Sequence, residues 1–76
     1  MYYVNIERLI GIMKARAEIE VERYASDFQY VYMESAHGKH RYDIRGGLVE
    51  TQNPITYQWG DEFDLTSEEH YLVGLK

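Results

Sequence analysis

The spacing of apolar residues changes near residue 17, and this change limits which folds the chain can adopt. Before that point, apolar residues recur at the 3.6-residue period of a helix, at Ile6, Leu9, Ile10, Met13 and Ala17. In the segment 17–23 that follows, apolar residues alternate with glutamates at the two-residue period of a strand. The sequence therefore predicts a helix followed by strands.

The predicted helix covers residues 5–16 and carries start signals. Asn5 is suited to be the N-cap, Val4 and Leu9 are spaced to form a hydrophobic staple, and Glu7 suits the positive end of the helix dipole. Gly11 weakens this helix by up to about 1 kcal/mol relative to alanine.

The rest of the chain predicts strands and a second short helix. Segment 28–34 is rich in β-formers, 35–39 is typical of a hairpin loop, and 40–45 continues as a strand. A short segment from Leu48 and the segment 55–59 are further candidate strands. The run Thr66-Ser-Glu-Glu69 matches a capping box that opens a helix through Leu75.

These elements predict one α+β domain over residues 1–76. Its N-terminal helix packs on a three- to four-stranded antiparallel sheet, and a short C-terminal helix docks on the body. The predicted core comprises Ile6, Leu9, Ile10, Met13, Ile19, Val21, Phe28, Tyr30, Tyr32, Ile44 and Leu72.

A second interpretation of residues 17–34 continues the first helix. Positions 6, 10, 13, 17, 21, 24, 28 and 31 are all apolar or aromatic and also follow a 3.6-residue period. No glycine or proline interrupts the chain between Gly11 and Gly38. We favour strands because tyrosine, valine and phenylalanine are dense after residue 27.

The charge is divided unevenly along the chain. Residues 1–47 carry as many acidic as basic residues, so the net charge of −5 resides in residues 48–76, where Lys76 is the single basic residue. An acidic surface repels nucleic acid and attracts basic partners. We therefore expect no direct binding of nucleic acid.

Size and composition set further limits. A chain of 76 residues without cysteine has neither disulfides nor thiolate metal sites, so oligomerisation or partner binding would contribute to its stability. An apolar fraction of 45% is too high for disorder, and no segment has the roughly 18–20 apolar residues that span a bilayer. We expect a folded cytoplasmic protein that makes no membrane contact.

The acidic part of the chain also contains aromatic residues. One interpretation is structural: Glu68 and Glu69 cap a helix, and the segment 61–64 is a solvated turn. The other is a partner-binding surface in which carboxylates face a basic groove and aromatic side chains, Tyr57 among the candidates, anchor the contact. The candidate binding residues are Glu50, Trp59, Asp61, Glu62, Phe63, Asp64, Glu68 and Glu69.

This layout of a short helix, a small meander and an acidic C-terminal part resembles the small acidic inhibitors encoded by phages. Some of these are anti-CRISPR proteins that mimic DNA in the recognition cleft of a Cas nuclease. The resemblance implies inhibition without catalysis, with Asp61, Glu62 and Asp64 in the place of phosphates. Duplex DNA carries one charge per about 1.7 Å of axis, so six carboxylates imitate only about two or three base pairs.

Other chemistry has little support in the sequence. His37 and His40 have the spacing His-x2-His, and Asp43 is a candidate carboxylate ligand beside them. His70 is distant in the sequence, and nothing in the sequence fixes a third ligand next to the two histidines, so we expect no metal site. The serines lie in turn or cap contexts, and Gly46-Gly47 alone does not form a phosphate-binding loop. We therefore predict a protein that is not an enzyme and needs no cofactor.

Two alternatives remain beside the inhibitor. The first is a self-associating assembly protein in which the acidic part of one copy meets the basic hairpin around residues 37–45 of another. The second is a small binder of RNA or single-stranded DNA that uses Tyr30, Tyr32 and Tyr42 beside Lys39, Arg41 and Arg45.

Overall fold

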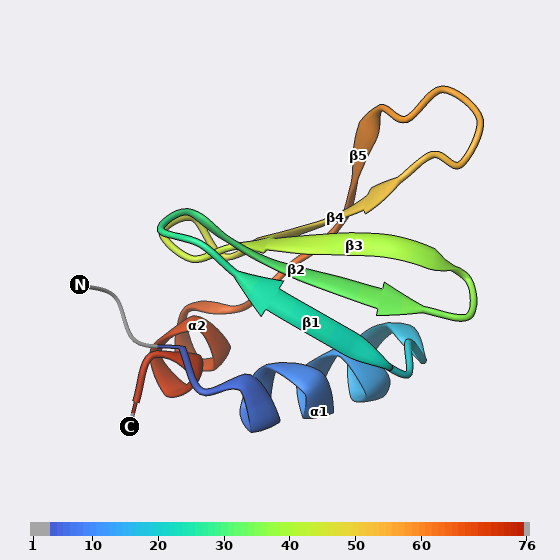
Figure 1. The fold of residues 1–76 in the computed structure, drawn as a ribbon. Helices are drawn as coiled ribbons and strands as arrows, with labels where there is room; N and C mark the ends of the chain where they lie inside the picture. Colours follow the sequence, from blue (N-terminus) through green and yellow to red (C-terminus); the bar gives the residue numbers. More distant parts are fainter. Residues whose placement is uncertain (1–3, 76) are drawn as a thin grey trace.

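The computed structural model describes residues 4–75 and has an α+β architecture (Figure 1). Two helices lie on the same side of a five-stranded antiparallel sheet whose strands follow one another in sequence order. The elements are α1 (Ile6–Ala17), β1 (Arg23–Ser26), β2 (Tyr30–Ser35), β3 (Gly38–Asp43), β4 (Leu48–Gln52), β5 (Trp59–Asp64) and α2 (Ser67–Val73). The predicted fold class is confirmed, whereas the predicted number of three to four strands is too low.

Helix α1 begins and ends where local chemistry requires. The Asn5 side chain accepts a hydrogen bond from the N–H of Arg8, which confirms the predicted N-cap. Glu18 then adopts a left-handed conformation, with φ of 56°, and its N–H bonds back to the carbonyl of Lys14. This end of the helix excludes the alternative in which one helix continues to residue 34.

In the alternating segment 17–23, Ala17 ends α1, residues 18–22 connect the helix to the sheet, and Arg23 begins β1, so the prediction of a strand through this segment was wrong. The N–H of Ile19 still bonds to the carbonyl of Met13, which holds the segment against the helix end. Ile19 is buried in the core and Val21 packs against it, while the intervening glutamates face solvent. The alternation of apolar residues and glutamates therefore arises because alternate side chains of this connection reach the core, although the connection itself is not a strand.

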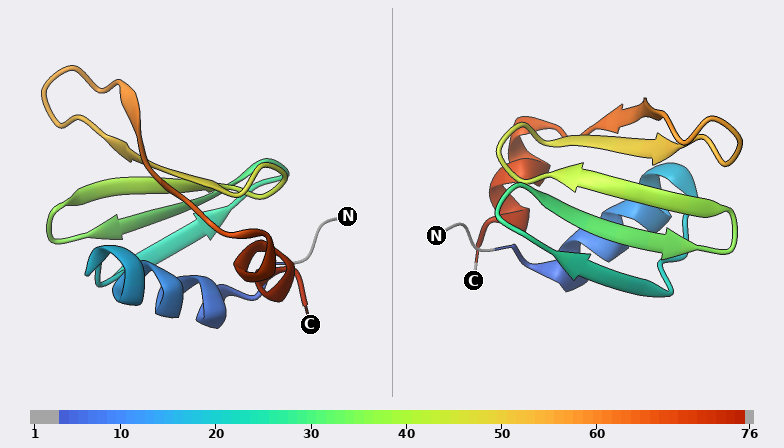
Figure 2. Two further views of the ribbon diagram at one scale, coloured as in Figure 1. Left: turned by 180° about the vertical axis from the view of Figure 1, so that it is seen from behind. Right: turned by 45° about the horizontal axis from the view of Figure 1, so that its top comes forward.

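The last strand lies later in the sequence than predicted. Residues 53–58 form the loop between β4 and β5, and the acidic segment 61–64, predicted as a possible turn, belongs to β5. The Asn53 side chain accepts the N–H groups of Ile55 and Thr56, which organises this loop. The β4–β5 hairpin rises from the rest of the sheet as a projecting arm (Figures 1 and 2).

The side chains of β2 point in the opposite sense to the prediction. Val31 and Met33 are buried under the helices, whereas Tyr32 is exposed on the other face of the sheet and Tyr30 shares that face. Phe28 lies outside the strands and is 89% exposed. The assignment of Tyr30 and Tyr32 to the core was therefore wrong because the opposite face of β2 is buried, and the assignment of Phe28 was wrong because this residue lies in the turn before the strand.

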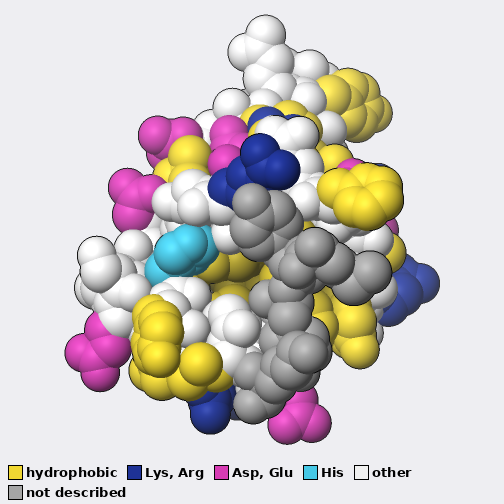
Figure 3. All heavy atoms as spheres, turned by 90° about the vertical axis from the view of Figure 1, so that its left-hand side faces the viewer, with side chains coloured by type: hydrophobic (Ala, Val, Ile, Leu, Met, Phe, Trp, Pro, Cys, Tyr) yellow, Lys and Arg dark blue, Asp and Glu magenta, His cyan; other side chains and the backbone are white. Residues whose placement is uncertain are grey.

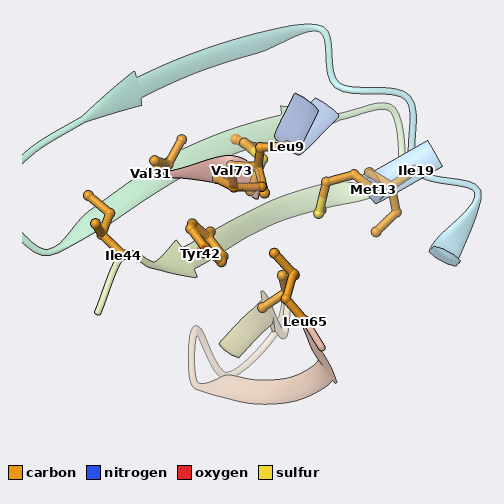
Figure 4. Packing of buried hydrophobic residues seen from close by; sticks show 10 residues of the cluster. Leu9, Met13, Ile19, Val31, Tyr42, Ile44, Leu65 and Val73 are labelled. Atoms are coloured by element: carbon orange, nitrogen blue, oxygen red, sulfur yellow. The ribbon is translucent and has the colours of Figure 1, made fainter. Parts of the chain in front are cut away.

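The core fills the space between the sheet and the helices. Figure 4 shows side chains from α1, β2, β3 and the C-terminal segments pointing toward one another. The buried cluster consists of Leu9, Met13, Ile19, Val31, Met33, Tyr42, Ile44, Val49, Leu65 and Val73. Leu72, predicted as core, is exposed, and the adjacent Val73 is buried in its place because α2 presents that residue to the sheet.

Helix α2 closes the fold beside the start of α1. The predicted capping box is confirmed: the Thr66 hydroxyl accepts the N–H of Glu69, and the Glu69 carboxylate accepts the N–H of Thr66. The N–H of Asn5 bonds to the carbonyl of Val73, and the Arg8 guanidinium bonds to the carbonyl of Leu72. The first and last helices are thereby tied together. Within the described residues, no helix has the length and apolar character to cross a membrane.

Candidate protein-binding surface

Trp59 lies at the start of β5 on the face of the sheet that the helices leave open. The guanidinium of Arg41 is stacked between two rings, 4.4 Å from the centroid of Trp59 and 4.3 Å from that of Tyr30. Tyr32 completes the cluster, with its ring centroid 6.5 Å from Trp59 and 5.7 Å from Tyr30. We call these four side chains the open-face aromatic cluster.

Glu50 is hydrogen-bonded to the arginine of this cluster. Its Oε1 accepts a hydrogen bond of 2.8 Å from Nε of Arg41, and the two side chains are only 15% and 20% exposed. Burial alone would lower the pKa of Arg41, but the hydrogen bond and charge of Glu50 raise it above its ordinary value. The pair is thus a fixed part of the sheet, and the carboxylate of Glu50 faces its own chain.

Three acids of the edge strand β5 remain exposed: Asp61, Glu62 and Asp64. A bulge occurs here, because Glu50 is opposite Asp61 while Val49 is opposite Phe63, which makes Glu62 an additional residue. Oε1 of Glu62 lies 3.4 Å from the Thr51 hydroxyl. No ion pair joins any of the three carboxylates to a cation within residues 4–75.

Phe63 points toward the helices, away from the open face. It is half-buried against the core opposite Val49, and the guanidinium of Arg16 lies 5.0 Å from its ring centroid. Arg16 also bonds to the carbonyl of Asp64 and pairs with Glu69. Phe63 therefore anchors β5 to α1, and the structure does not bring it together with Trp59.

The acids of α2 divide in the same way between structural and exposed positions. Glu69 caps the helix, and the pKa of its carboxyl is lowered first by the hydrogen bond from the Thr66 N–H and further by Arg16. Glu68 is exposed in the first turn. Of the eight candidate residues, the structure thus leaves four carboxylates exposed: Asp61, Glu62, Asp64 and Glu68.

A shallow hollow of about 640 Å³ lies on the open face next to Trp59. Residues of all five strands line it, among them Arg23, Tyr32, Glu34, Lys39, Gln52 and Trp59. Arg23 and Glu34 form an exposed ion pair across the β1–β2 ladder. The hollow was not predicted because Tyr32 was assigned to the core. Tyr30 and Tyr32 alternate with Val31 and Met33, and this alternation carries no local signal of which face is exposed.

The histidines have separate structural positions. His40 is buried, and hydroxyls of Ser35 and Thr51 lie 2.9 Å from its Nε2 and Nδ1. Burial lowers the pKa of His40, partly opposed by the charge of Glu62. Since both ring nitrogens already have partners, His40 is not presented to a metal ion. No cluster of metal-ligating side chains occurs among residues 4–75.

His70 lies far from His37 and contacts Tyr42. The Tyr42 hydroxyl and Nδ1 of His70 are 2.6 Å apart, and burial raises the pKa of Tyr42 to about 12. This contact fastens α2 to β3. Tyr42, one of the candidate stacking residues, therefore belongs to the core.

The tip of the projecting arm is exposed and apolar. Ile55 is 84% and Tyr57 is 70% exposed, and Tyr57 is held with a positive φ of 63°. The side chain of Gln52 donates to the carbonyl of Tyr57, which fixes the tip further.

At the end of the molecule shown in Figure 3, hydrophobic side chains form separate patches interspersed with charged ones.

No protein-family model matches this chain, and searches of curated proteins and of solved structures gave no significant match.

Proposed function

We propose that this protein is a non-enzymatic binding protein whose strand β5 presents an acidic surface, with Trp59 beside it, to a basic protein surface. The supporting observation is that Asp61, Glu62 and Asp64 are exposed with no cation paired to them in the described chain. Residues 46–75 contain no lysine or arginine, and Arg16 and Arg41, which contact β5, are already paired with Glu69 and Glu50. The negative field along β5 is therefore uncompensated.

The spacing of these charges supports a nucleic-acid-binding enzyme as the partner. A strand advances about 3.3 Å per residue, so residues 61–64 span about 10 Å. The two intervals between the three carboxylates average about 5 Å along the strand, which is of the same order as the one charge per about 3.4 Å of axis of a single DNA strand. Strand β5 thus offers the charge of about three nucleotides, enough for a short phosphate-binding cleft.

Position in the fold supports the same proposal. Strand β5 is at an edge of the sheet, so a partner reaches its carboxylates without displacing another element. The tip of the projecting arm carries the exposed side chains of Ile55 and Tyr57, which supply apolar area near the charges. Inhibition then results from occupying the partner's cleft, and no bond is made or broken.

The acids have a competing structural explanation that the experiment has to address. Charges and a bulge on an edge strand prevent pairing with other strands, whatever else they do. The test is capture of partners from cells of the native host with three baits. These are the wild type, the variant Asp61→Asn/Glu62→Gln/Asp64→Asn, and a control.

The control, Glu7→Gln/Glu18→Gln/Glu22→Gln, changes the net charge equally at exposed acids far along the chain from β5. We expect the wild type and the control to recover the same basic protein and the β5 variant to lose it. Equal recovery by all three baits would refute the assignment to β5.

A second candidate function is binding of single-stranded nucleic acid in the open-face hollow. It is favoured by Tyr32 and Trp59, whose rings line the hollow beside Arg23 and Lys39. The protein has one tryptophan, so its fluorescence reports directly on this face. Quenching of Trp59 by oligonucleotides at 50 mM salt, lost in Tyr32→Ala and weakened in Lys39→Gln, would support this function; unchanged emission would exclude it.

A further inference from the structure

The two edges of the sheet are built differently. Strand β5 has a bulge and three exposed acids, which are common protections against pairing with another strand. Strand β1 has neither a bulge nor a proline, and Arg23 is its only charged residue. All four of its residues are exposed, and in the right-hand view of Figure 2 β1 forms the lower border of the sheet.

The ladder between β1 and β2 determines which main-chain groups of β1 face outward. The N–H of Asp27 donates to the carbonyl of Tyr30, so residues 27, 25 and 23 direct their main-chain groups toward β2. Tyr24 and Ser26 alternate with these and direct their N–H and C=O groups away from the sheet. Among residues 4–75, no strand lies beyond β1 to accept them.

We infer that β1 pairs with β1 of a second copy of this chain, antiparallel and about a two-fold axis at Ala25. Outward-directed residues have to face each other in an antiparallel ladder, which places Tyr24 opposite Ser26 of the second copy. Ala25 then lies opposite Ala25 of the second copy. Arg23 lies opposite Asp27 of the second copy, twice in each dimer because of the symmetry.

The charges favour a two-fold axis at Ala25 over an axis at either adjacent residue. Arg23, Ala25 and Asp27 alternate onto one face of the sheet, so the opposed guanidinium and carboxylate share a face. Shifting the two-fold axis to Tyr24 or to Ser26 leaves Arg23 opposite a neutral residue. The self-complementary charges are the reason to choose a second copy of the chain over an unrelated strand as the occupant.

Both charged groups are able to make the new contact. The Arg23 side chain is 80% exposed although it pairs with Glu34 at 3.0 Å. Asp27 uses Oδ1 to accept the N–H groups of Gln29 and Tyr30, and Oδ2 makes no hydrogen bond within the described chain. The backbone hydrogen bonds also lower the pKa of Asp27, so it carries its charge at neutral pH.

The resulting dimer has a continuous ten-stranded sheet with the helices of both copies on one face. Its two outer edges are the acidic β5 strands, so dimerisation leaves the proposed partner surface accessible. The pairing of so few residues falls below the roughly 1,200 Å² of a standard interface. We therefore expect a weak, reversible dimer that forms between about 10 µM and about 1 mM protein.

The test combines sedimentation equilibrium with hydrogen exchange. Over that concentration range the wild type should pass from monomer to dimer. The amides of Tyr24 and Ser26 should then exchange more slowly, while those of Arg23 and Ala25, already bonded to β2, change little. A wild type that stays monomeric throughout would overturn the inference.

Two kinds of variant locate the contact. Ser26→Pro removes an outward N–H without disturbing the bonds to β2, and it should abolish association while circular dichroism stays unchanged. Arg23→Gln should weaken the dimer at least tenfold, whereas Lys39→Gln, which changes the net charge equally on β3, should not. Undiminished association of Ser26→Pro, or equal weakening by the two glutamine variants, would place the interface elsewhere.

Discussion

Removing the guanidinium of Arg41 should cost more stability than any other change on the open face. In Arg41→Ala, Glu50 keeps a carboxylate that is only 15% exposed and loses its partner. An unpaired, largely buried charge together with the loss of stacking on Tyr30 and Trp59 amounts to about 3 kcal/mol. A chain of 76 residues has a total stability of about 4–11 kcal/mol, so this is a large share.

A double-mutant cycle tests the coupling of Arg41 and Glu50. Glu50→Ala alone should cost about 2 kcal/mol, and Arg41→Ala/Glu50→Ala should cost about 1–2 kcal/mol less than the sum of the single variants, because the second change removes a charge that the first left unpaired.

Urea unfolding followed by far-UV circular dichroism is the appropriate assay, since Trp59 emission is itself altered by removal of Arg41. The control is Lys14→Ala, which breaks an exposed ion pair with Glu20 and should cost under about 0.5 kcal/mol. Single-variant effects that add within about 0.3–0.5 kcal/mol would refute the coupling of Arg41 and Glu50.

Three further predictions follow from the core and its turns. Burial lowers the pKa of His40, so below pH 6.5 the unfolded chain binds a proton that the folded chain does not. The urea concentration at the unfolding midpoint should therefore be lower at pH 5.5 than at pH 7.5, and His40→Gln should reduce this difference. Val31→Ala should lower the unfolding free energy by about 2 kcal/mol and Tyr32→Ala by less than half as much; the reverse order in chemical denaturation would contradict the observed strand phase. Gly47→Ala should destabilise by about 1–2 kcal/mol, because φ is 79° and a Cβ would lie 3.2 Å from Nδ1 of His70; an unchanged melting temperature would contradict this.

Helix positions were predictable because their signals are local. The side chains of Asn5 and Thr66 each accept a hydrogen bond from an N–H group three residues further along, so both N-caps can be predicted from the sequence alone. Leu9 and Met13 follow the helical period and are buried as predicted. Both helices consequently lie within about two residues of their predicted positions.

Strand faces were harder to predict because both faces of β2 are apolar or aromatic. Tyr30 and Tyr32 alternate with Val31 and Met33, and either set fits a core on composition alone. The choice is made by residues distant in sequence: Arg41 and Trp59 stack with the tyrosines on one face, while α1 covers the valine and methionine on the other.

The candidate site was predicted as a segment, but its division into structural and exposed acids was not. Glu50 and Glu69 are neutralised by Arg41 and Arg16, which lie 9 and 53 residues away in the sequence. Such pairs depend on the sheet register and on helix docking, and neither is readable from local patterns. The three acids of β5 were recognisable from their density.

The most direct test of the central claim is an equilibrium titration of the captured partner with the wild-type chain and with Asp61→Asn/Glu62→Gln/Asp64→Asn, followed by Trp59 fluorescence. The account predicts that the wild type binds with a change in Trp59 emission, that binding weakens as salt rises, and that the triple variant loses affinity about 100-fold or more. Equal affinity of the two chains, with no dependence on salt, would contradict the assignment of the binding surface to β5.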